Sequence, residues 1–93
     1  MTQPVAVGLR ARLVAASLEI SHLRAIATNP GTLAELAETQ ALIDRAGLHM
    51  SDDMPADVAA NIDVALTMAR HRLRAIHNAI AAHGRDAAVK PRT

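Results

Sequence analysis

Residues 59–83 decide the fold, and they read AANIDVALTMARHRLRAIHNAIAAH. Apolar side chains recur in this stretch at alternating steps of three and four residues. The row comprises Ala59, Ile62, Leu66, Ala69, Leu73, Ile76 and Ile80, with His83 at the next position. Such spacing, held over three heptads, is typical of a helix that packs one face along other helices in a bundle or coiled coil.

A second row with the same spacing lies near the N-terminal end of the chain. It comprises Ala6, Leu9, Leu13, Ala16, Ile20, Leu23 and Ala27. We call the two rows the N-terminal seam and the C-terminal seam. Together they predict an all-α fold with two long helices, over about residues 4–27 and 55–83. Small alanines recur within both seams, at Ala6, Ala16 and Ala27 and at Ala59 and Ala69, and they predict that the helices approach each other closely.

A shorter helix is predicted between the two long ones, over residues 32–46. The first helix should end at residues 29–31, Asn-Pro-Gly, because proline cannot continue the hydrogen bonds of a helix. Thr32 followed by Glu35 has the spacing of a capping box, which predicts a helix start at Thr32. Gly47 is expected to end this helix in the left-handed conformation.

The third helix is expected to begin near Pro55, since proline is tolerated in the first turn of a helix. Residues 48–54 should form the preceding loop. Gly84 is expected to end the helix. We therefore predict a single helical domain over residues 1–84 and a flexible basic C-terminal tail over residues 85–93.

A homodimer is expected from the lengths of the three helices. At 1.5 Å per residue the long helices would extend about 35 and 43 Å, and the middle helix only about 22 Å. A middle helix of that length would leave part of each seam uncovered, and Val14 and Leu18 add an apolar patch outside the N-terminal seam. Two-fold dimers are the commonest closed assemblies. The predicted oligomer interface comprises Leu9, Leu13, Ile20, Leu23, Leu66, Leu73, Ile76 and Ile80.

The composition excludes several kinds of site. The 93 residues include 21 alanines but no cysteine, so disulfides, thiolate metal sites and cysteine nucleophiles are absent. The chain has no aromatic residue, which argues against recognition of nucleobases by stacking on aromatic rings. No run of 18 apolar residues occurs, so we expect no membrane span and a soluble, cytoplasmic protein.

Charge is segregated along the chain although the total is +1. Residues 32–63 carry seven acids against Arg45, while residues 64–93 carry six basic residues against Asp86. The basic segment could contact phosphate groups. The candidate anion or nucleic-acid contacts are Arg70, Arg74, Arg85, Lys90 and Arg92. The interpretation that we favour is that these side chains are solvated flanks of the bundle and pair with other helices.

Two further binding motifs receive little support. A helix-turn-helix motif needs a tight turn inside residues 32–50, where the helical pattern instead continues to Gly47. A histidine metal site would need rings on one side of a helix. His71, His77 and His83 lie six residues apart, so successive rings point about 240° apart. We therefore expect no metal site, and metal carriage by histidine remains a third hypothesis.

Catalysis lacks a recognisable set of residues. The four glycines are well separated and form no phosphate-binding loop, and the serines lack the setting of a nucleophile. We expect no enzyme activity and no cofactor. The favoured hypothesis is a small interaction or regulatory protein that acts through protein–protein contacts of a dimeric bundle, with an unknown partner. The alternative is a small nucleic-acid-binding regulator. The bias toward alanine and arginine is typical of GC-rich bacterial or phage coding sequences.

Overall fold

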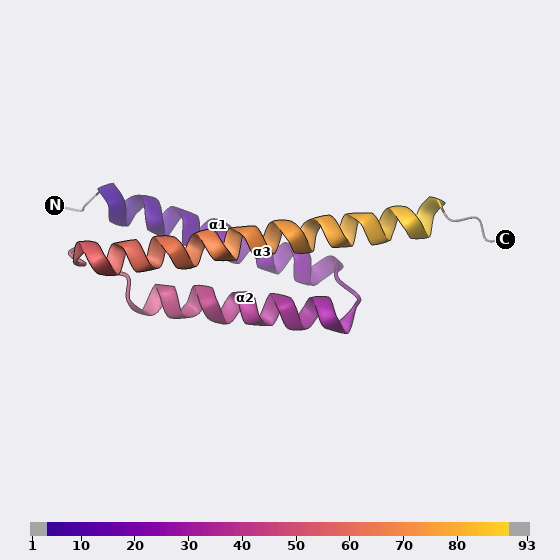
Figure 1. Ribbon diagram of the computed structural model, residues 1–93, viewed down its shortest axis with the longest axis horizontal. Coiled ribbons are helices and arrows are strands. Elements are labelled where there is room, and N and C mark those ends of the chain that lie inside the picture. Colours follow the sequence, from indigo (N-terminus) through magenta and orange to yellow (C-terminus); the bar gives the residue numbers. More distant parts are fainter. Residues whose placement is uncertain (1–3, 90–93) are drawn as a thin grey trace.

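The computed structural model describes the backbone of residues 4–89 and the side chains of residues 5–82. Three helices follow one another: α1 (Pro4–Ile26), α2 (Pro30–Leu48) and α3 (Ala56–Val89). Figure 1 shows that α1 and α3 run in the same direction and that α2 runs back between their ends. The prediction of an all-α chain with three helices is confirmed.

Asn29 and Pro30 start α2 two residues earlier than predicted. The side chain of Asn29 accepts a hydrogen bond of 2.7 Å from the backbone N–H of Gly31, and its carbonyl accepts the N–H of Leu33. Pro30 takes the first helical position, where its fixed φ fits and its missing N–H leaves no bond unmade. The predicted capping box of Thr32 and Glu35 is therefore wrong. The proline that excludes Asn29 from a helix also begins the next one.

The two predicted glycine ends are also wrong. Gly47 lies inside α2, which ends at Leu48 and is capped by His49 with an ordinary φ of −96°. The third helix continues past Gly84 to Val89, so residues 85–89 of the expected tail are helical. None of the described residues has a positive φ. A glycine within a helix costs only about 1 kcal/mol relative to alanine, which the continuing hydrogen bonds can outweigh.

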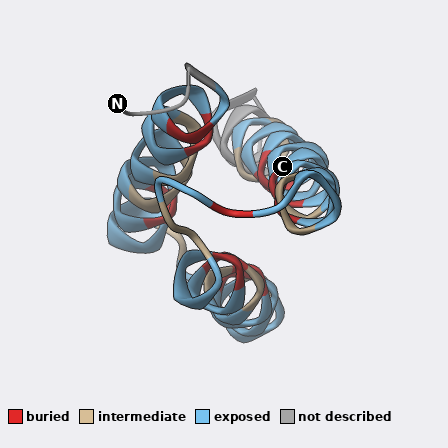
Figure 2. Ribbon diagram, turned by 90° about the vertical axis from the view of Figure 1, so that its left-hand side faces the viewer, coloured by how far each residue is buried: buried red, intermediate tan, exposed pale blue. Residues whose placement is uncertain are grey.

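The core fills the space enclosed by the three helices, and in Figure 2 the buried residues lie on the sides where the helices face one another. It has two clusters. The first comprises Ile20, Leu23, Leu36, Ile43, Ala69, Leu73 and Ile76. The second comprises Ala6, Leu9, Ala46, Met54, Ile62 and Leu66. Each helix contacts the other two.

The described residues of both predicted seams lie in this core. Of the eight residues predicted to form an oligomer interface, six are buried within one chain, and Leu13 and Ile80 are half-buried against the same clusters. The expectation that one chain leaves the seams uncovered is wrong, because α1 and α3 also pack against each other. The middle helix need not cover both seams alone. In this arrangement the described seam residues are occupied by contacts within one chain.

Thr39 is the one fully buried polar side chain among the described residues. Its hydroxyl donates to the carbonyl of Glu35 at 2.8 Å, one helical turn earlier. Within the described part of the chain, no buried side-chain nitrogen or oxygen lacks a partner. None of the described helices is long and apolar enough to cross a membrane.

Candidate interaction surface

A row of uncharged side chains lies on the face of α1 that points away from the core. Val7 and Val14 are each 55% exposed and Leu18 is 67% exposed. These residues continue at steps of three and four, as the buried seam does, but on the opposite side of the helix. We call the row the outer stripe of α1; it comprises Val7, Ala11, Val14, Leu18, Ser21 and Ala25, all of which are exposed.

The four charged residues of α1 lie at the edges of the outer stripe and not on it. Arg10 and Arg24 are fourteen residues apart on the edge nearer α2, and Arg12 and Glu19 are seven apart on the edge nearer α3. Ion pairs draw two of them toward the rest of the chain. Arg10 pairs with Asp52 in the loop before α3, and Arg12 pairs with Asp63 in α3.

Charged residues usually occupy the solvent face of a surface helix. The solvent face of α1 lacks them. Single exposed aliphatic side chains are normal, but a continuous apolar row is typical of a contact surface. The sequence indicates its centre, since Val14 and Leu18 were recognised as a patch. The prediction from sequence did not include the other members of the row, which are Val7, Ala11, Ser21 and Ala25. The absence of charge along the whole row is the signal that could have identified them.

The predicted basic contacts are only partly placed by the structure. Arg70 and Arg74 are exposed on α3, seven and eleven residues after Asp63 and so on the same side toward α1. The side chain of Arg85, and Lys90 and Arg92, lie outside the described residues.

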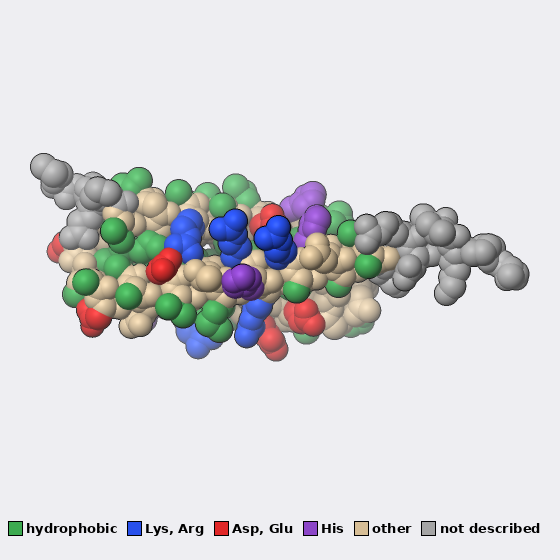
Figure 3. Space-filling view, turned by 45° about the horizontal axis from the view of Figure 1, so that its top comes forward, with side chains coloured by type: hydrophobic (Ala, Val, Ile, Leu, Met, Phe, Trp, Pro, Cys, Tyr) green, Lys and Arg blue, Asp and Glu red, His purple; other side chains and the backbone are tan. Residues whose placement is uncertain are grey.

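The surroundings of these arginines are mixed in charge. Because α1 and α3 are parallel, Glu19, seven residues after Arg12, lies level with Arg70, seven residues after Asp63. Figure 3 shows Arg side chains interspersed with acidic and histidine side chains on this face. The negative neighbours lower the positive potential there, which weakens the attraction for phosphate groups.

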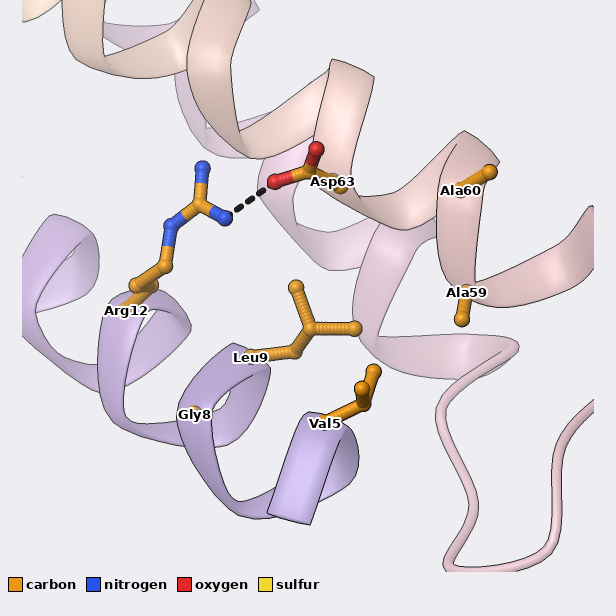
Figure 4. A pocket seen from close by; sticks show the side chains of 7 residues that line it. All are labelled: Val5, Gly8, Leu9, Arg12, Ala59, Ala60 and Asp63. Carbon is orange, nitrogen blue, oxygen red and sulfur yellow. Dashed lines mark hydrogen bonds and ion pairs between the residues drawn. The ribbon is translucent and has the colours of Figure 1, made fainter. Parts of the chain in front are cut away.

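Two shallow pockets accompany the helix contacts. One, of about 400 Å³, lies between α1 and α3; it is lined by Val5, Gly8, Leu9, Arg12, Ala59, Ala60 and Asp63 (Figure 4). Its two charged side chains are already paired with each other. The other, of about 420 Å³, lies between α2 and α3; it includes Arg45, His49 and Asn61 among apolar residues.

The residues considered for metal binding are separated in the described structure. His71 and His77 are exposed on α3, and His83 has no described side chain. No group of three or more potential ligands comes together among the described residues.

Comparison of the chain with protein-family models, curated proteins and solved structures gives no match in any of the three.

Proposed function

We propose that the protein is a small non-enzymatic interaction protein that acts through protein–protein contacts of a dimeric helical bundle. The observation that carries the proposal is the uncharged outer stripe of α1. Burying a branched aliphatic side chain contributes roughly 1.5–3 kcal/mol when it was fully exposed, so a row of them favours association.

Charge favours a second copy of the chain as the occupant of this surface. Two copies that meet through one surface bring two patches of the same net charge together. The second helix holds three acids against one arginine, a net charge of −2, so pairing α2 with α2 is repulsive. The part of α3 around Arg70, Arg72 and Arg74 is positive and repels its own copy. The outer stripe of α1 carries no charge to repel.

The expected dimer is reversible. A helix face about 35 Å long and 10 Å wide is smaller than the roughly 800 Å² per partner of a typical stable interface. We therefore expect a weak dimer whose population rises with protein concentration.

Sedimentation equilibrium tests this proposal with one disruptive variant and one matched control. Leu18→Glu places a charge at the centre of the outer stripe and should make the chain monomeric. Leu48→Glu makes the same change at the end of α2, where the side chain is 81% exposed, and should leave the dimer intact. A monomeric wild-type chain at high micromolar concentration would refute the proposal.

Nucleic-acid binding is a second candidate function, favoured by the exposure of Arg70 and Arg74 one turn apart on the same side of α3. Binding to phosphate groups should weaken steeply as salt rises. A mobility-shift titration with random duplex DNA at two salt concentrations tests it. Replacing both arginines by alanine should abolish a real interaction, whereas Arg45→Ala should not. No binding at low salt would end this candidate.

A further inference from the structure

We infer that two copies pair antiparallel through α1, with the two-fold axis at the level of Ala16, so that Val14 and Leu18 of both copies form the centre. The inference rests on the proposed function and adds the orientation and register of the contact. Three features of α1 and its surroundings support it: the spacing of the outer stripe, the sizes of its side chains and the charges near its edges.

The spacing allows every stripe residue to meet another one in the antiparallel arrangement. The steps from Val7 to Ala25 are 4, 3, 4, 3 and 4, which read the same from either end. An axis at Ala16 therefore places Val7 opposite Ala25, Ala11 opposite Ser21 and Val14 opposite Leu18. Each pairing occurs twice, once on either side of the axis.

Side-chain size favours this register over a parallel one. In parallel pairing each residue faces its own copy, so two Leu18 side chains meet directly beside a level that holds only two Ser21 side chains. In antiparallel pairing the large side chains gather at the centre, and each Val7 faces the small Ala25. The summed side-chain size then varies less from level to level than in the parallel pairing, which favours close packing.

The loop before α3 adds a charge argument. The pair formed by Arg10 and Asp52 fixes this loop beside the N-terminal half of α1, and Asp53 follows directly. Parallel copies would bring the two acidic loops to the same end of the dimer. Antiparallel copies instead bring Arg24 of one chain to the level of the Arg10–Asp52 pair of the other. At that level the other chain carries one positive charge, Arg10, and two negative charges, Asp52 and Asp53, and this net negative charge attracts Arg24. Antiparallel alignment also brings opposite ends of the two helix dipoles together.

Site-specific disulfides test the orientation, and the absence of native cysteine makes the experiment clean. Val7→Cys and Ala25→Cys are made as separate single variants, checked for native helicity, and oxidised with glutathione alone and as a mixture. A disulfide needs Cα atoms about 4.4–6.8 Å apart. In the antiparallel dimer, position 7 of one copy lies near position 25 of the other and about 27 Å from its own equivalent.

The expected result is a disulfide-linked dimer in the mixture only, with a mass that identifies one chain of each variant. Linkage within each variant alone would show a parallel dimer and overturn the inference while leaving the proposed function intact. Dimers in sedimentation without any linkage would mean that a different surface makes the contact, which also overturns it. A monomeric chain would refute the proposed function as well.

A charge variant gives an independent measurement. Arg24→Glu puts a negative charge at the level of Asp52 and Asp53 of the other copy and should raise the dissociation constant severalfold. Arg45→Glu makes the same change on α2, away from the outer stripe, and should leave the dissociation constant unchanged. Equal effects of the two variants would contradict the antiparallel arrangement.

Discussion

Arg12 of α1 pairs with Asp63 of α3, and the same guanidinium donates a second hydrogen bond of 3.0 Å to the hydroxyl of Thr67. The two contacts tie the parallel helices together near the shallow pocket between them. They also hold the charge of Arg12 over α3 and away from the outer stripe of α1. One ion pair thus serves both the fold and the uncharged character of the exposed face.

The Arg12–Asp63 pair should contribute little to stability because both side chains are partly exposed. A double-mutant cycle with Arg12→Ala and Asp63→Ala should give a coupling energy of about 0.2–1 kcal/mol. Urea denaturation of the four proteins measures it, and the coupling should fall as salt rises. A coupling above about 2 kcal/mol would contradict the exposed geometry.

Leu73 should be a main source of core stability, since it is only 3% exposed and packs in the first cluster. Leu73→Ala should lower the free energy of unfolding by about 2–5 kcal/mol through lost burial and the cavity left behind. Leu48→Ala removes the same atoms from a solvated site and should change it by less than about 0.5 kcal/mol. Similar losses in the two variants would show that Leu73 is not in the core. Both free energies come from chemical denaturation at one protein concentration.

Asn29 should matter more than Thr32 for the start of α2. Asn29→Ala removes the side-chain oxygen that accepts the N–H of Gly31 and should cost about 1 kcal/mol. Thr32→Ala should cost less, because Thr32 is inside the helix and alanine has the higher helix propensity. Thermal unfolding followed by circular dichroism compares the two. A larger loss of stability for Thr32→Ala than for Asn29→Ala would support the capping box of Thr32 and Glu35 instead.

The methyl group of Thr39 should contribute more than its hydroxyl. Thr39→Val keeps the shape of the side chain, and the carbonyl of Glu35 remains a helical acceptor, so stability should change by less than about 0.5 kcal/mol or rise. Thr39→Ala leaves a small cavity and should cost about 1 kcal/mol. Chemical denaturation separates these cases. A larger loss for Thr39→Val than for Thr39→Ala would mean that the hydroxyl dominates.

The sequence predicted the helical class and the two seams because side-chain periodicity follows directly from helix geometry. The prediction of helix ends failed at Pro30 and Gly47, because each of these residue types is compatible with two positions relative to a helix. Proline can end one helix or begin the next, and glycine can cap a helix or lie within it. Local sequence does not determine which of the two positions is adopted. The packing of the neighbouring helices determines it.

Coverage of the seams could not be predicted from helix lengths alone. Leu9 and Leu66 need no second chain to bury them if α1 and α3 touch. That contact is a property of the arrangement of the helices in space. The candidate surface was partly predictable. Val14 and Leu18 were recognised because they are large, whereas Ala11 and Ser21 were missed because small residues carry little apolar signal.

The parallel course of α1 and α3 has a practical consequence for engineering this chain. Pro4 and Val89 lie at opposite ends of the bundle, separated by roughly the 50 Å length of α3 (Figure 1). A circular permutant that joined them would need a bridging peptide of about 15 residues even when fully extended. Fluorescent reporters fused at the two positions would, for the same reason, stay far apart.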